Sequence, residues 1–263
     1  MTREIDAGGL TIARRLLDGS SAFRESALRE AWVRHVVSAV PPADAARALE
    51  VVCIEAERGD PTARELLVSL VGALLGGPPL LATALREEAE KGSHLALGRL
   101  LRKPTTRETE DEANDDALRI PDYGRGRPLT LGERRALARR PDRKDFDKLL
   151  RDPHPMVIIN LLANPRLTAE DLLRVAARKS TPAEILVAIA KHPRWSRERR
   201  VRVALVLNAR TPDEIAVALV SLLNRTELRV VMQVTTTPDA VRVAARELSV
   251  RRPPVSRDPS GEA

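Results

Sequence analysis

The chain has 263 residues, 43% of them hydrophobic, so it is long enough to bury a sizeable core in one large or two modest domains. Only 2% of the residues are aromatic and 31% are charged. Leu, Val, Ile and Ala must therefore build the core, which favours helices. The formal net charge of +7 keeps the chain soluble and attracts anionic partners only weakly.

The single cysteine, Cys53, lies in the apolar run LEVVCIEA. One cysteine excludes a disulfide within the chain and a cysteine-based metal site. The first residues, MTREIDAGGL, contain no apolar signal-peptide core. We therefore expect a buried, unreactive thiol and a cytoplasmic protein.

Residues 1–103 are expected to form an N-terminal helical region. Within it, DPTARELL provides Asp60 as an N-cap, with Pro61 at the first helical position. The uncharged stretch 66–85 is long enough to cross a membrane. However, GGPP at 76–79 interrupts it, so we expect two buried helices joined by a tight turn and no membrane span.

Composition changes sharply after this region. Residues 105–117 contain six acids and one base, so they cannot bury an apolar face. Residues 119–151 then carry eleven Lys or Arg against five Asp or Glu. The acidic and basic segments either simply neutralise each other or form an autoinhibitory tether. The expected order is a helical region (1–103), an acidic linker or mobile loop (104–118), a helical-repeat domain (119–250) and a disordered tail (251–263).

Helix-start signatures recur through the repeat domain at intervals of 11 to 15 residues. They are found at Thr168, Thr181, Ser196, Thr211, Thr226 and Thr237. Every second start is therefore 26 to 30 residues from the last, which fits a pair of antiparallel helices. A period of this length is typical of a solenoid.

The helix starts share a capping chemistry. In TPAE and TPDE, the Thr hydroxyl can accept from the backbone N–H three residues on, and the Glu can reach back to the N-cap N–H. Pro then occupies the first helical position, and acids in the first turn complement the helix dipole. The predicted capping residues are Thr130, Glu133, Thr168, Thr181, Glu184, Thr211, Glu214 and Thr237.

The segments LLANPRLTAEDLLRVAARKSTPAEIL, VALVLNARTPDEIAVAL and QVTTTPDAVRVAA resemble the short helical repeats of bacterial leucine-rich-repeat-variant and HEAT-like proteins, over about 125–248. The resemblance implies a curved, right-handed α-solenoid used for binding. Family members with an iron–sulfur cluster use a group of cysteines that this chain lacks, so no cofactor is expected. The predicted fold is all-α: short antiparallel helix pairs stacked as a HEAT-like α-solenoid, preceded by an N-terminal helical bundle.

No residue pattern indicates catalysis. The four histidines have no His or Cys at ligand spacing, which argues against a metal site. The chain also lacks a glycine-rich phosphate loop and a Gly-x-Ser-x-Gly nucleophile motif. Carboxylate pairs such as Asp213 and Glu214 fall in first helical turns, which suits capping more than acid–base chemistry. We predict no catalytic, metal or cofactor residue and a protein that is not an enzyme.

Arginines precede several helix starts. Because consecutive helices run in opposite directions, Arg166, Arg194 and Arg225 are expected along one edge, and Arg210 along the other with residues 178–179. Each Arg either closes the C-terminus of the preceding helix or contributes to a basic ridge for carboxylates or phosphates. Trp195 is either an exposed anchor or a packing residue. The candidate partner-binding residues are Arg166, Arg194, Trp195, Arg210 and Arg225.

Two functions follow from these observations. The first is a non-enzymatic scaffold or adaptor that binds an acidic or helical protein segment. The alternative is a HEAT-like nucleic-acid-binding protein that uses the Arg-rich edge, although few aromatics are present for base stacking. The sequence is compatible both with packing of residues 1–103 on the repeats and with their movement on the linker.

Overall fold

The computed structural model describes residues 7–104, 120–140 and 142–253, and all regular structure within these ranges is helical. The predicted all-α class is confirmed. The N-terminal group of helices consists of α1 (Ala7–Ser20), α2 (Ser26–Ser38), α3 (Pro42–Arg58), α4 (Pro61–Leu75), α5 (Pro79–Lys91) and α6 (Leu95–Leu100). The later group consists of α7 (Leu131–Arg139), α8 (Arg143–Leu149), α9 (Pro155–Leu162), α10 (Ala169–Ala176), α11 (Ala183–Lys191), α12 (Arg199–Leu207), α13 (Asp213–Val220), α14 (Arg225–Gln233) and α15 (Asp239–Ser249).

The N-terminal group is built around α3, which packs against α1, α4, α5 and α6. Asp60 caps α4, because its carboxylate accepts from the Ala63 N–H at 2.7 Å. The uncharged stretch is split as expected: Gly76 is the C-cap of α4, and Pro79 begins α5. Within the described residues, no helix combines the length and apolar character needed to cross a membrane.

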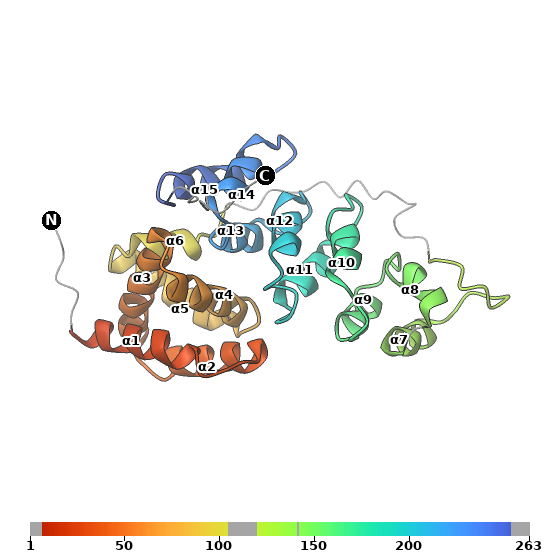
Figure 1. Cartoon of the computed structure of the whole chain (residues 1–263), viewed down its shortest axis with the longest axis horizontal. Coiled ribbons are helices and arrows are strands. Elements are labelled where there is room, and N and C mark those ends of the chain that lie inside the picture. Colours follow the sequence, from red (N-terminus) through yellow and green to blue (C-terminus); the bar gives the residue numbers. More distant parts are fainter. Residues whose placement is uncertain (1–6, 105–119, 141, 254–263) are drawn as a thin grey trace, which may run out of the picture.

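In the later group, most pairs of alternate helices are in contact. Contacts join α7 to α9, α9 to α11 and α13 to α15, and on the other layer α10 to α12 and α12 to α14. Figure 1 shows α12, α11, α10, α9, α8 and α7 following one another away from the N-terminal group. This is the neighbour pattern that stacked helix pairs require. That the stack is a curved HEAT-like solenoid remains a prediction.

The N-terminal group packs directly on the later helices, through contacts of α4 with α11 and α13. Arg102 Nη2 pairs with Glu247 Oε2 at 2.7 Å. The buried guanidinium of Arg252 donates to the carbonyls of Ala56 in α3 and Ser221 at the end of α13. Burial lowers the pKa of Arg252 to about 10, so it remains a cation at neutral pH. The two groups of helices are therefore joined by both packing and charge-assisted hydrogen bonds.

The disordered tail predicted from the sequence begins at residue 251, which is too early. The prediction of disorder from residue 251 is wrong for residues 251–253, because Arg252 is only 4% exposed and bonded to both helical groups. Residues 254–263 lie outside the described residues. The acidic segment 105–117 also lies outside them.

Candidate partner-binding site

Three of the four predicted arginines, Arg166, Arg194 and Arg210, lie in turns that are fixed by a side chain two residues earlier. In each case this side chain accepts a hydrogen bond from the backbone N–H of the arginine, forming a local turn. The acceptor and donor pairs are Asn164 with Arg166 (2.9 Å), His192 with Arg194 (3.3 Å) and Asn208 with Arg210 (3.0 Å). Sequence reasoning missed these residues, although the recurring triplets NPR, HPR and NAR carry the signal.

The turns of one edge are bonded to each other across the repeat. The Asn208 amide donates to the carbonyls of Ala176 at 2.7 Å and Arg178 at 3.0 Å, and Arg210 Nη1 donates to the Ser180 carbonyl at 3.4 Å. These partners are 30 to 32 residues apart in the chain. Arg210 therefore lies beside residues 178–180, as the alternation of helix directions predicts.

The opposite edge carries an equivalent set of bonds. Arg194 donates to the carbonyls of Leu167 at 3.1 Å and Asn164 at 3.5 Å. Its guanidinium carbon lies 4.1 Å from the Trp195 ring centroid, a cation–π geometry. Trp195 is 3% exposed, and its indole N–H donates to the Leu162 carbonyl at 2.9 Å. Trp195 is thus a packing residue, and its interpretation as an exposed anchor is wrong.

The four candidate arginines therefore differ in the bonds that their side chains make. Arg194 and Arg210 bond to carbonyls of the preceding repeat unit, which gives them a structural role. The side chains of Arg166 and Arg225 make no hydrogen bond or ion pair within the described part of the chain. Arg166 is exposed, and Arg225 is half-buried at the first position of α14. That any of the four binds a partner stays a prediction.

Two predicted helix starts have the expected capping geometry. Thr130 accepts from the Glu133 N–H at 3.3 Å, and Glu133 Oε2 accepts from the Thr130 N–H at 2.8 Å. Thr168 forms the same box with Asp171. At α14, however, the capping box belongs to Asn224 and Glu227 and not to Thr226. The helix therefore begins one residue before the predicted cap.

The three threonines that precede proline are not N-caps. Helices α11, α13 and α15 begin after Pro182, Pro212 and Pro238, which are the N-cap residues and make no side-chain cap bond. Instead, the buried hydroxyls bond backward, because the last carbonyls of the preceding helix lack helical partners. Thr181 donates to Val175 (2.7 Å) and Thr211 to Leu205 (2.6 Å), whereas the hydroxyl of Thr237 has no partner within the described residues.

Because the N-cap lies one residue later than predicted, the role of the predicted acidic partners also changes. Glu184 and Glu214 occupy the second helical position and not the third. They cannot complete a capping box there, so the box predicted for them is wrong. Their carboxylates remain in the first turn, where they complement the helix dipole.

A substitution at Thr211 tests whether this residue bonds backward to Leu205 or takes part in a capping box with Glu214. Thr211→Val is expected to lower the free energy of unfolding by about 1 kcal/mol, because the buried Leu205 carbonyl loses its partner. Glu214→Gln should have a much smaller effect, since that exposed carboxylate acts only on the dipole. Urea unfolding followed by circular dichroism measures both. Equal losses in the two variants would instead support a capping box.

A groove of about 730 Å³ lies over α10 and α12, and we refer to it as the α10–α12 groove. Leu173 on α10 and Val203 on α12 contribute apolar side chains, and Leu207 follows four residues after Val203 on the same helix face. The apolar lining consists of Leu173, Ala177, Val203, Ala204, Leu207 and Ala209. The polar and charged lining consists of Lys179, Arg199, Arg200, Asn208, Arg210, Glu227 and Thr236.

The rim of this groove is predominantly basic. Arg199 pairs with Glu227, which is itself part of the lining. Arg200 pairs with Glu170 at 3.2 Å, and both of these side chains are more than 60% exposed. Lys179 is exposed and makes no ion pair within the described residues. The groove therefore combines an apolar floor with cations whose existing pairs are weak in solvent.

Outside this groove, few of the described residues could bind a metal ion or act as a nucleophile. No group of three or more His, Cys, Asp or Glu side chains that could hold a metal ion is present among the described residues. Cys53 is buried, and burial raises the pKa of its thiol. It is therefore a protonated core side chain at neutral pH.

Comparison of the chain with protein-family models, curated proteins and solved structures gives no match. The resemblance to leucine-rich-repeat-variant and HEAT-like repeats therefore remains a prediction from the motifs.

Proposed function

We propose that this chain is a non-enzymatic helical-repeat adaptor that binds an acidic, helical segment of another protein in the α10–α12 groove. The observation that carries the proposal is the apolar floor of the groove with basic side chains along its rim. The buried thiol is consistent with action in the reducing cytoplasm.

The shape of the floor favours a helix as the ligand. An amphipathic helix places apolar anchors three and four residues apart on one face, and such a face fits an apolar groove formed between two helices. Acidic residues beside those anchors would meet Lys179 and Arg200, forming charge-assisted hydrogen bonds. The positive rim also disfavours a basic partner, so it contributes to specificity.

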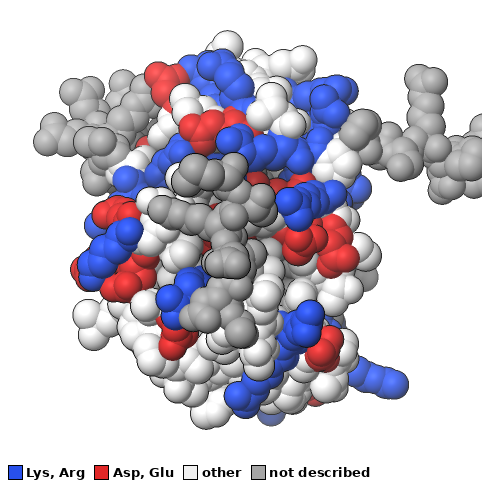
Figure 2. All heavy atoms as spheres, turned by 90° about the vertical axis from the view of Figure 1, so that its left-hand side faces the viewer, with Lys and Arg blue, Asp and Glu red and all other residues white. Residues whose placement is uncertain are grey.

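Nucleic-acid binding is the less favoured candidate. A nucleic-acid surface needs a continuous run of cations along the phosphate backbone. On the face formed by the N-terminal end of the molecule, basic and acidic side chains are interspersed (Figure 2). On the repeats too, carboxylates lie among the arginines, as Asp171 does beside Arg174 and Glu170 beside Arg200, so the cations do not form a continuous run.

A photo-crosslinking experiment tests the groove directly. A photoreactive phenylalanine analogue at Val203, inside the groove, should crosslink to a discrete protein in cells of the source organism. Mass spectrometry should locate the crosslink in a segment with acidic residues and apolar residues at helical spacing. The same analogue at Leu95, which is 69% exposed on α6, is the control position.

Charge reversal provides the matched comparison. Lys179→Glu combined with Arg200→Glu should abolish the crosslink from position 203, because both rim cations become repulsive toward an acidic segment. Arg58→Glu combined with Lys91→Glu changes the net charge equally but lies on α3 and α5, so it should leave the crosslink unchanged. Crosslinking to nucleic acid, or equal crosslinking in both double variants, would contradict the proposal.

A further inference from the structure

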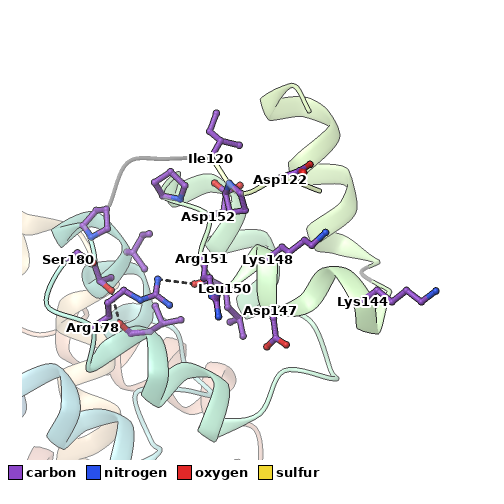
Figure 3. A pocket seen from close by; sticks show the side chains of 16 residues that line it. Ile120, Asp122, Lys144, Asp147, Lys148, Leu150, Arg151, Asp152, Arg178 and Ser180 are labelled. Atoms are coloured by element: carbon purple, nitrogen blue, oxygen red, sulfur yellow. Dashed lines mark hydrogen bonds between the residues drawn. The ribbon is translucent and has the colours of Figure 1, made fainter. Parts of the chain in front are cut away.

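A second cavity, of about 930 Å³, lies where α8, the segment 120–123 and the turn between α10 and α11 meet (Figure 3). It is separate from the α10–α12 groove. Its apolar lining consists of Ile120, Pro121, Leu150, Pro153, Val175, Pro182 and Ile185. Its basic lining consists of Lys144, Lys148, Arg151 and Arg178.

Two arginines, Arg151 and Arg178, line this cavity together. Arg178 is half-buried, and its Nη1 donates to the Leu150 carbonyl at 3.4 Å, next to Arg151 (Figure 3). Burial and the nearby positive charge of Arg151 together lower the pKa of Arg178. The Arg151 side chain makes no hydrogen bond or ion pair within the described residues. The two like charges therefore line one cavity, and neither forms an ion pair within the described residues.

The carboxylates that line the cavity are held by other groups. Asp152 accepts from Arg134 at 2.6 Å and from the Tyr123 hydroxyl at 2.9 Å. Asp147 is 3.7 Å from Arg174, and Asp122 accepts from the Gly124 N–H at 2.8 Å. None of these bonds involves Arg151 or Arg178.

We propose that this cavity binds the phosphate group of a small organic phosphate. Arg151 and Arg178 would donate to the phosphate oxygens, since two guanidinium forks match the charge and the oxygen count of a dianion better than those of a carboxylate. The organic part of the ligand would pack on the apolar wall formed by Pro121, Pro182 and Ile185. Binding would remove the repulsion between the two arginines.

Calorimetric titration of the full chain with phenyl phosphate, inorganic phosphate and benzoate, at matched ionic strength, tests the site. Phenyl phosphate should bind most tightly, inorganic phosphate more weakly, and benzoate weakest. Arg151→Gln should weaken phenyl phosphate binding by a factor on the order of ten, the loss of one charge-assisted contact. Lys191→Gln is the matched control, because this exposed cation at the end of α11 lies outside the lining of the cavity.

Each alternative result overturns a defined part of the proposal. Equal affinity for benzoate and phenyl phosphate would contradict recognition of phosphate. Equal affinity for inorganic and phenyl phosphate would contradict the role of the apolar wall. Equal weakening in Arg151→Gln and Lys191→Gln would show non-specific charge attraction. Arg178→Gln removes the bond to the Leu150 carbonyl as well as a charge. Arg151→Gln breaks no bond, so it keeps the test valid if Arg178→Gln misfolds.

Discussion

Replacing Asp152 with alanine is expected to lower the free energy of unfolding by about 3–5 kcal/mol, because the change leaves a buried cation without its partner. The Asp152 side chain is fully buried, and that of Arg134 is 6% exposed. Arg134 Nη1 donates to both carboxylate oxygens, at 2.6 and 2.7 Å, and the Tyr123 hydroxyl donates at 2.9 Å. The His154 N–H completes the set at 3.0 Å, so one carboxylate joins α7, the segment before it and the start of α9.

Urea unfolding of three variants separates the burial effect from the loss of a side chain. Asp152→Ala alone should be severely destabilised. Asp152→Leu with Arg134→Met should recover only part of the loss, since an apolar pair needs no compensating charge but leaves the Tyr123 hydroxyl and the His154 N–H without their acceptor. Glu170→Ala breaks the exposed pair with Arg200 and should change stability little. If Asp152→Ala loses no more stability than Glu170→Ala, the buried pair contributes no more to stability than the exposed pair.

Features that depend on neighbouring residues were predictable from the sequence. Capping at Asp60, Thr130 and Thr168 needs only side chains within three residues of the helix start. The interruption of the uncharged stretch at 76–79 likewise follows from local glycine and proline geometry. The regular spacing of these starts is also sufficient to indicate paired helices.

Features that depend on burial or on the stacking of repeats were not predictable in the same way. Thr168 and Thr211 look alike in sequence, yet the second bonds backward because its hydroxyl is buried against the end of α12. Arg252 lies in a polar, proline-rich tail, and its partner carbonyls are 31 and 196 residues away. The α10–α12 groove joins residues about 30 positions apart, so its existence depends on the register of the stack.

A buried acid at the junction of the two helical groups should make stability depend on pH. Glu30 of α2 is 3% exposed, and its Oε1 has no hydrogen-bond partner within the described residues. The carboxyl lies against Gly72 of α4, where an added Cβ would come within 2.5 Å of the Glu30 Cδ. Burial raises the pKa of Glu30 from 4.5 to about 7, and the opposing charges of Arg197 and Arg34 are too weak to cancel that effect.

The sign of the pH effect follows from the raised pKa. The folded state binds the Glu30 proton more tightly than the unfolded state, so this contribution to stability is fully present below pH 4.5 and is lost as pH rises through about 7. The loss amounts to about 3 kcal/mol. Glu30→Gln mimics the protonated acid and should remove this dependence, so the variant should be more stable than the unsubstituted chain at about pH 8 and equal to it at about pH 4.

Urea unfolding of both proteins across this pH range checks the expectation. The control is Glu90→Gln, which removes an exposed carboxylate of α5 and should leave the pH dependence unchanged. The same pH profile in Glu30→Gln and the unsubstituted chain would mean that the pKa of Glu30 is the same in the folded and unfolded states. A profile that flattens only in Glu30→Gln would instead place a titrating group next to Arg197, where the N-terminal helices meet the repeats. Because Arg197 pairs with Glu65 of α4 and lies close to Glu30 of α2, ionisation of Glu30 acts on the same contact that joins the two helical groups.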